Sequence, residues 1–201
     1  MSNTINRVGI YGGSFDPFHL GHFHIIETAL RELPIKDLWL LPNYLNPFKV
    51  CAMFDASMRL QMCERVAQAF QSQGFNVYVC DFEIKQNRAV YTIESIEYLK
   101  EILRLESKPF FLLGEDSFAT LSQWRESQRL TQMLDLVVVE RAVSASPYPS
   151  PLAYSKLTLP TCLRDLSSTH LRQLLQQGYL DEALEQIPSC LHSFLRQNFV
   201  H

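Results

Sequence analysis

Residues 8–22 read VGIYGGSFDPFHLGH, and the pattern of this stretch decides the fold that we expect. A short apolar, β-favouring run comes first, Gly12 and Gly13 follow it, and apolar residues with helical spacing begin at Phe23. This order predicts a strand, a tight glycine turn and a helix. Both glycines leave the backbone free to adopt positive φ and to approach a ligand closely. The helix would point N–H groups and its positive dipole end at the same place, which favours phosphate binding.

His19 and His22 lie within this stretch, three positions apart. Near the first turn of a helix, this spacing places both side chains on one face. Such histidines can simply cap the helix or be buried structural residues. A pair beside a glycine turn is more typical of a site that binds an anion. Asp16 is predicted to shape the turn or to cap the helix rather than to hold a metal ion.

The composition is that of an ordinary globular domain. The chain has 201 residues, 47% of them hydrophobic, which is enough to bury a core. The net charge is −3 and no block of Lys and Arg occurs, so no nucleic-acid partner is expected. We see no leader pattern and no apolar run long enough to span a bilayer, which predicts a cytoplasmic protein without a membrane partner. The 5 cysteines are scattered, as expected of free thiols in a reducing compartment.

The rest of the chain alternates strand-like and helix-like stretches. We expect strands over residues 37–41, 75–84, 110–113 and 136–139, with amphipathic helices between them. Ser57 and Thr92 are the predicted N-caps of two of these helices. The continuous apolar run at 136–139 is typical of a strand covered on both faces. The sequence therefore predicts an α/β fold with a doubly wound, mainly parallel sheet of five or six strands.

The last part of the chain divides in two. Residues 142–160 are rich in Ser and Pro, which predicts a surface loop, and the loop region as a whole covers residues 142–165. Residues 166–201 show helical patterns and predict a small C-terminal helical part. We therefore expect a single domain over residues 1–201, with its α/β core over residues 1–141.

Residues 167–172 read SSTHLR and open an amphipathic helix. Hydroxyl groups at this place are typical of an ordinary N-cap. They also suit phosphate oxygens, together with backbone N–H groups, and Arg172 can add a bidentate contact from one turn into the helix. On these residues alone, both interpretations stay open.

Two signatures of the chain together resemble those of one enzyme family. Residues 12–22 match the Gly-Gly-x-Phe-Asp-Pro-x-His-x-Gly-His signature of nucleotidyltransferases, and residues 167–172 match their second signature, Ser-[Ser/Ala]-Thr-x-[Ile/Leu]-Arg. Most of the chain resembles the bacterial nicotinate-nucleotide adenylyltransferases. The resemblance implies a Rossmann-like nucleotidyltransferase fold. It also implies that the adenylyl group of ATP is transferred to nicotinate mononucleotide, giving deamido-NAD and pyrophosphate in NAD biosynthesis.

The resemblance also assigns roles to individual residues. It implies that His19, His22 and Arg172 are catalytic. The ATP phosphates would be bound by Gly12, Gly13, Ser14, Phe15, Lys49, Ser167, Ser168 and Thr169. The mononucleotide would be bound by Asn43, Tyr91, Thr92, Gly114, Asp116, Trp124 and Arg141. Mg²⁺ would arrive with ATP, held by phosphate oxygens and water, so no residue is assigned to a metal.

The chain departs from the family pattern on the mononucleotide side. Asn46-Pro47-Phe48-Lys49 replaces the usual Pro-Pro-His-[Lys/Arg], Ala89-Val90 replaces Pro-Ser, and Ala142 replaces a proline. Arg125 follows Trp124 in place of the aromatic or other residue that is usual there. Both phosphate signatures are intact, so the departures concern the mononucleotide and its affinity rather than adenylyl transfer itself.

Other functions remain compatible with these residues. The chain could be a sister adenylyltransferase that acts on nicotinamide mononucleotide, phosphopantetheine or another phosphate acceptor. It could also be a non-catalytic regulatory relative that binds a nucleotide. The phosphopantetheine enzymes usually carry Thr at the place of His19, which disfavours them. The sequence is compatible with a homo-oligomer and does not decide the oligomeric state.

Overall fold

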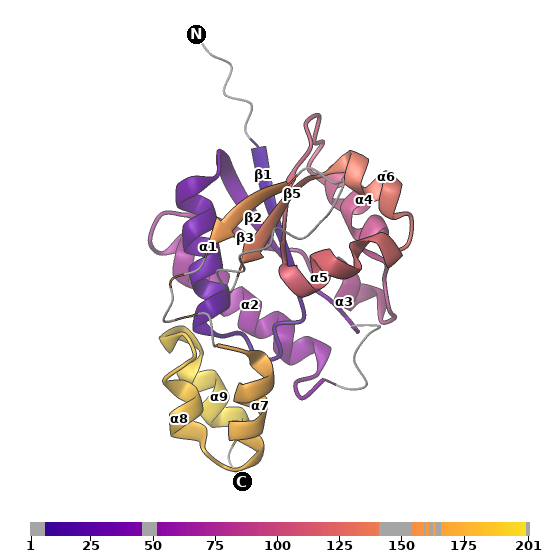
Figure 1. Cartoon of the computed structure of the whole chain (residues 1–201). Coiled ribbons are helices and arrows are strands. Elements are labelled where there is room, and N and C mark those ends of the chain that lie inside the picture. Colours follow the sequence, from indigo (N-terminus) through magenta and orange to yellow (C-terminus); the bar gives the residue numbers. More distant parts are fainter. Residues whose placement is uncertain are drawn as a thin grey trace.

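The computed structural model describes residues 7–45, 52–140, 154–158, 160, 163 and 166–199. A central sheet carries helices on both sides, and further helices lie at one end of it (Figure 1). The elements in chain order are β1 (Arg7–Gly13), α1 (Leu20–Glu32), β2 (Ile35–Pro42), α2 (Ala56–Gln71), β3 (Asn76–Val79), α3 (Phe82–Gln86), α4 (Thr92–Ile102), β4 (Phe110–Gly114), α5 (Glu115–Thr120), η1 (Leu121–Gln123), α6 (Ser127–Met133), β5 (Asp135–Glu140), β6 (Tyr154–Thr158), α7 (Ser168–Gln176), α8 (Leu180–Leu184), η3 (Ser189–Leu191) and α9 (His192–Asn198).

The described sheet has six strands in the order β3-β2-β1-β4-β5-β6, and every neighbouring pair is parallel. The chain begins in the middle with β1, adds β2 and β3 on one side, and returns to add β4, β5 and β6 on the other. The prediction of a doubly wound parallel sheet is thus confirmed. The winding reverses between β1 and β4, and folds of this kind bind ligands at the carboxyl ends of the strands at such a reversal.

Each face of the sheet is covered by its own group of helices. On one face α1, α2 and the C-terminal helices share a core that includes Ile26, Phe70 and Leu175. On the other face α4, α5 and α6 share a second core with Ile96 and Leu130. Figure 1 shows α1 and α2 on one side of the strands and α4 and α6 on the other. Covering on both faces explains the continuous apolar run of β5, whose buried side chains alternate between the two cores.

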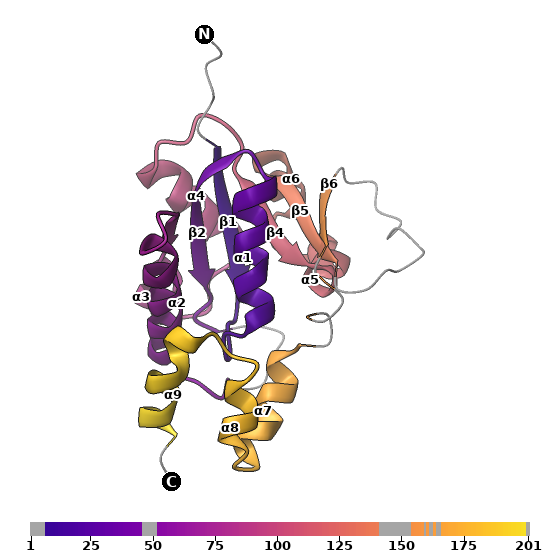
Figure 2. The same cartoon turned by 90° about the vertical axis from the view of Figure 1, so that its left-hand side faces the viewer.

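Helices α7, α8 and α9 lie beyond the end of the sheet at which the strands finish, as Figures 1 and 2 both show. Their buried side chains, among them Leu171, Leu191 and Phe194, join the core on the α1 and α2 face. The predicted helical C-terminal part is therefore confirmed. Its place at the carboxyl ends of the strands brings it to the edge where a ligand site is expected.

The prediction of a strand over residues 75–84 is wrong beyond Val79. Strand β3 ends there, and residues 82–86 form α3. The ring of Phe82 stacks on Tyr98 of α4 with ring centres 4.2 Å apart, and the Glu83 carboxylate accepts a hydrogen bond of 2.7 Å from Ser95. These contacts come from residues more than ten positions away, so a pattern in the local sequence could not predict them.

The Ser- and Pro-rich stretch expected to be a surface loop contains β6. Its residues pair with β5 along the whole strand, from Leu136 opposite Tyr154 to Glu140 opposite Thr158. Only the Leu157 side chain of β6 is buried, at 1% exposed. One buried residue in a five-residue edge strand leaves too short a pattern to predict a strand from sequence.

Two helices begin close to the expected places but with other caps. Asp55, rather than Ser57, is the N-cap of α2, and its carboxylate accepts a hydrogen bond of 2.8 Å from the N–H of Met58. Tyr91, rather than Thr92, precedes α4, and its N–H donates to Glu94 at 3.0 Å. The predicted caps, Ser57 and Thr92, lie in the first turn of α2 and α4, respectively.

Candidate active site

The carboxyl end of β1 carries Gly12 and Gly13, both within the extended strand. The two glycines do not use their freedom to adopt positive φ: in this loop positive φ occurs at Phe15, where φ is 49°. Instead, the absence of a side chain on each glycine leaves room for a neighbouring aromatic ring. A Cβ on Gly13 would lie 2.9 Å from the Phe15 ring, and one on Gly12 would lie 3.3 Å from the ring of Phe111 on neighbouring β4. The buried Phe15 ring can therefore pack against the end of the strand.

His19 and His22 are joined at the start of α1. His19 is the N-cap, and its Nδ1 accepts a hydrogen bond of 3.1 Å from the N–H of Gly21. Nδ1 of His22 accepts one of 3.2 Å from the N–H of His19. The two rings stack with their centres 3.7 Å apart and are 2% and 8% exposed. A neutral imidazole whose Nδ1 accepts carries its proton on Nε2, so both rings are hydrogen-bond donors at Nε2.

Gly21 is required by this arrangement. A Cβ at this position would lie 2.8 Å from Cε1 and 2.9 Å from Nδ1 of His19. Any other residue would push the imidazole away from the N–H that it accepts from. The glycine between the two histidines is thus explained by close packing of a ring against the backbone.

The Asp16 carboxylate holds the chain that enters α2. It is 2% exposed and accepts hydrogen bonds from the N–H groups of Met53 at 3.1 Å and Phe54 at 2.9 Å. Asp16 thus shapes the backbone, as the sequence predicted. Because both of its oxygens are engaged by N–H groups, the carboxylate is poorly placed to act as a metal ligand.

The second signature touches the first across more than 150 positions of sequence. Ser167 is the N-cap of α7, and the Ser168 hydroxyl donates to the carbonyl of Pro17 at 3.1 Å. Nη1 of Arg172 donates to the carbonyl of Asp16 at 2.7 Å and lies 3.6 Å from its carboxylate. Nη2 of Arg172 donates to the hydroxyl of Thr169 at 3.0 Å. The fold therefore brings both phosphate signatures to one place.

Arg59 of α2 is a residue of this region that the sequence interpretation missed. Its side chain is 2% exposed. The guanidinium donates to the backbone carbonyls of Ser14 at 2.9 Å, Asn43 at 2.6 Å, Tyr44 at 2.6 Å and Phe54 at 3.1 Å. Burial lowers the pKa of Arg59, and the negative charge of Asp16 opposes this shift. Arg59 thus fastens the loops after β1 and β2 to the start of α2.

A signal for Arg59 was present in the sequence. It stands three positions before Met62 and seven before Val66, on the buried side of α2. An arginine on an apolar stripe is rare unless its charge is paired or hydrogen-bonded. Nearby, the amide of Asn43 donates to the Ser14 hydroxyl at 3.2 Å, which brings two further predicted residues together.

The remaining predicted mononucleotide residues lie after β4 and β3. Gly114 ends β4, the neighbour of β1, and Asp116 is exposed in the first turn of α5. Trp124 follows η1 and is partly buried, and its Nε1 donates to the hydroxyl of Thr120 at 3.4 Å. Thr92 is the first residue of α4. Gly114, Asp116 and Trp124 thus belong to the segment that follows β4, and Thr92 belongs to the start of α4.

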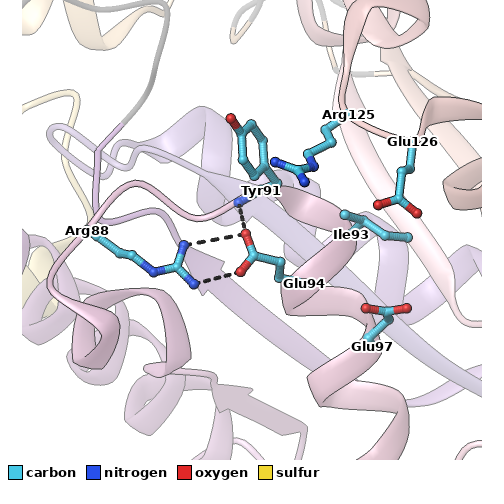
Figure 3. Close-up of a pocket in the computed structure, with 7 residues that line it drawn as sticks. All are labelled: Arg88, Tyr91, Ile93, Glu94, Glu97, Arg125 and Glu126. Atoms are coloured by element: carbon cyan, nitrogen blue, oxygen red, sulfur yellow. Dashed lines mark hydrogen bonds and ion pairs between the residues drawn. The ribbon is translucent and has the colours of Figure 1, made fainter.

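A cavity of about 340 Å³ lies between the start of α4 and the segment that leads into α6 (Figure 3). Tyr91 and Arg125 face each other there, with the guanidinium carbon 4.7 Å from the centre of the tyrosine ring. The lining consists of Arg88, Tyr91, Ile93, Glu94, Glu97, Arg125 and Glu126. Among the predicted site residues, Tyr91 lines this cavity and Trp124 immediately precedes Arg125.

Glu83 is a buried carboxyl group next to this region. It accepts hydrogen bonds from the Ser95 hydroxyl and from the backbone N–H of Tyr44. Burial raises the pKa of Glu83 to about 7, although both hydrogen bonds oppose the shift. The carboxyl group links α3 with α4 and with the loop after β2.

Two predicted ligands, Lys49 and Arg141, lie outside the described residues. Within the described ranges, no group of three or more His, Cys, Asp and Glu side chains is arranged to hold a metal ion. In the same part of the chain, no helix has the length and apolar character needed to cross a membrane.

Comparisons with known proteins agree with this geometry. Residues 10–174 match the cytidylyltransferase-like family. A protein of Helicobacter hepaticus is 38% identical over 99% of both chains, and one of Nitratiruptor is 33% identical over 87% of this chain and 92% of its own. Both carry the name "Probable nicotinate-nucleotide adenylyltransferase".

A solved structure supports the fold. The Plasmodium falciparum nicotinic acid mononucleotide adenylyltransferase, complexed with NaAD, superposes with a TM-score of 0.77 over 96% of both chains. Its sequence identity to this chain is 18%, so the likeness concerns the arrangement of strands and helices. The family assignment rests on the more similar sequence relatives. The chain therefore belongs to the cytidylyltransferase-like family and, within it, to the nicotinate-nucleotide adenylyltransferases.

Proposed function

We propose that this protein transfers the adenylyl group of ATP to nicotinate mononucleotide, producing deamido-NAD and pyrophosphate. One observation carries the proposal: the histidine pair at the start of α1 and the hydroxyl-rich start of α7 meet at the carboxyl end of β1. Two helix starts with polar side chains at one point suit a polyphosphate better than any neutral ligand. The names of the relatives support the choice of mononucleotide.

The reaction requires positioning more than acid or base chemistry. A phosphate oxygen of the mononucleotide attacks the α-phosphorus of ATP and forms a new P–O bond. The bond from the α-phosphorus to the bridging oxygen breaks in line with it, and its electron pair leaves with pyrophosphate. The attacking oxygen is already anionic at neutral pH, so no strong general base is needed.

On the ATP side, we assign the charge-stabilising role to His19 and His22. Their Nε2–H groups would donate to the triphosphate as negative charge moves to the leaving group. The turn of Gly12, Gly13, Ser14 and Phe15 would surround the α-phosphate. Ser167, Ser168, Thr169 and Arg172 would hold the β and γ phosphates, and Lys49 would add a further cation.

On the mononucleotide side, we assign the residues that follow β2, β3 and β4. These are Asn43, Tyr91, Thr92, Gly114, Asp116 and Trp124, with Arg141 after β5. Tyr91 and Trp124 would offer aromatic surfaces to the pyridine ring. The strand order supports this assignment, because β2 and β4 are the two neighbours of β1 and the residues after them lie at the same carboxyl end of the sheet.

Mg²⁺ would be bound with ATP, largely through phosphate oxygens and water. When bound, it neutralises phosphate charge and favours departure of pyrophosphate. The engaged carboxylate of Asp16 fits this view, since it is occupied by two backbone N–H groups. The described thiols Cys63, Cys80 and Cys190 are free, which fits a cytoplasmic enzyme.

The decisive experiment measures pyrophosphate release by the purified protein with ATP and Mg²⁺. Nicotinate mononucleotide, nicotinamide mononucleotide and phosphopantetheine are offered in parallel. We expect turnover with the nicotinate substrate to exceed that with the other two. Preference for another acceptor would keep adenylyl transfer but change the substrate. ATP binding without any pyrophosphate release would contradict the proposal.

A further inference from the structure

Three arginines and three glutamates cluster around the cavity at the start of α4. Arg88 binds Glu94 with an N–O distance of 2.6 Å. Arg129 of α6 binds Glu126 at 2.9 Å and also pairs with Glu97. These two arginines therefore engage all three carboxylates. In the described part of the chain, no carboxylate is hydrogen-bonded to the third arginine, Arg125.

Arg125 is held in the cavity by another type of contact. Its guanidinium carbon lies 4.7 Å from the centre of the half-exposed Tyr91 ring, in a cation–π contact. Such a contact does not use the guanidinium N–H groups, which can then donate to a planar, bidentate partner. Figure 3 shows Arg125 beside Tyr91 and away from the Arg88–Glu94 pair. Among the described residues, the cavity thus offers one cation that is not hydrogen-bonded to a carboxylate.

We propose that Arg125 determines specificity by binding the carboxylate on the pyridine ring of the mononucleotide. This inference rests on the proposed function and adds a residue that the family resemblance does not assign. A carboxylate presents two oxygens to the edge of the guanidinium, whereas a carboxamide presents one oxygen and an N–H₂ group that meets donors only. Arg125 therefore favours the acidic ring substituent over the amide. Arg125 directly follows Trp124, which the proposed function assigns to the pyridine ring.

The test compares two substrates in variants of the full chain. We measure kcat/KM for nicotinate mononucleotide and for nicotinamide mononucleotide in the wild type, Arg125→Lys and Arg125→Gln. We expect Arg125→Gln to lower kcat/KM for the nicotinate substrate roughly tenfold or more, and that for the nicotinamide substrate less than about twofold. The ratio of the two values should fall in the order Arg, Lys, Gln. KM for ATP should stay unchanged.

Arg104→Gln serves as the matched control, since it removes the same charge from an exposed residue beyond the other end of α4. It should leave the ratio at the wild-type value. An unchanged ratio in Arg125→Gln, or an equal loss with both substrates, would overturn the inference.

Calorimetric measurement of the affinity for both mononucleotides distinguishes failure of the inference about Arg125 from failure of the proposed function. A wild type that turns over neither substrate would refute the proposed function. Even then, tighter binding of the nicotinate compound that is lost in Arg125→Gln would support the role of Arg125. Equal affinities of the wild type for both compounds would refute it.

Discussion

At the scale of single residues, His19 combines a structural and a proposed chemical role. Its Nδ1 caps α1 by accepting the N–H of Gly21, while its Nε2–H is proposed to bind the triphosphate. The two roles can be separated because asparagine is also a good N-cap and lacks the imidazole donor. The sequence interpretation weighed capping against anion binding as alternatives. The geometry shows the capping through Nδ1, and the contact through Nε2 belongs to the proposed function.

We predict that His19→Asn changes the free energy of unfolding by less than about 1 kcal/mol. Turnover should fall about 100-fold or more, as for the loss of one donor to a developing anion. Urea unfolding and pyrophosphate release measure the two effects. His24→Asn, which removes a partly exposed imidazole paired with Glu27 on the same helix, should leave turnover unchanged. Wild-type turnover in His19→Asn would remove the histidine from the mechanism.

At the same scale, Glu83 makes the stability of the folded protein depend on pH. Burial raises its pKa from 4.5 to about 7 in the folded protein. Between these values the folded state holds a proton that the unfolded chain has released. The contribution of Glu83 to the free energy of unfolding is therefore full below pH 4.5 and is lost as the pH rises to about 7.

We predict that Glu83→Gln abolishes this dependence. Relative to the variant, the wild type should lose stability on the order of 1–3 kcal/mol between the two pH limits. Urea unfolding of both proteins across this range measures the difference. The exposed Glu101→Gln on α4 is the control and should retain the wild-type slope. A difference between the wild type and Glu83→Gln that does not vary with pH would contradict the assignment.

At the scale of elements, the docking of α7 on the loop after β1 is the central feature. An amphipathic helix with hydroxyls at its start is common, and its sequence does not say what it packs against. Here Leu171 and Leu175 fix the buried face of α7. The hydrogen bonds of Ser168 and Arg172 then attach its first turn to Pro17 and Asp16. The element thus carries the second phosphate signature to the first.

We predict that Arg172→Gln raises KM for ATP roughly tenfold or more, because a bidentate cation and the attachment to Asp16 are both lost. Initial rates at varied ATP measure this effect. Arg196→Gln on α9 removes an arginine whose ion pair with Asp181 is exposed to solvent. Such pairs contribute little, so this control should keep the wild-type KM. An unaltered KM in Arg172→Gln would separate α7 from ATP binding.

At the scale of the whole molecule, β6 completes the sheet from a part of the sequence that predicted a loop. Leu157, 1% exposed, is its contribution to the core beneath α1 and the C-terminal helices. We predict that Leu157→Ala lowers the free energy of unfolding by about 2–4 kcal/mol. Ser155→Ala, at an exposed position of the same strand, should have almost no effect. Equal stabilities of the two variants in urea would contradict a buried β6.

The same scale shows which parts of the site were predictable. The first five strands, the histidine pair and both phosphate signatures follow from local patterns, because caps, turns and apolar spacing act over a few residues. The positive φ at Phe15 could not be predicted, since the packing of its ring against the strand end decides that turn. The role of Arg59 was missed because four carbonyls from separate segments define it.

The sequence by itself determined the doubly wound α/β class, the place of the turn between β1 and α1 and the two signatures proposed to bind phosphate. The tertiary structure alone decided that Arg172 meets Asp16, that Arg59 fastens three segments, and that Arg125 faces Tyr91. The physical reason is the range of the interactions. Local propensities depend on neighbours along the chain, whereas burial and side-chain hydrogen bonds depend on partners that only the completed fold brings together.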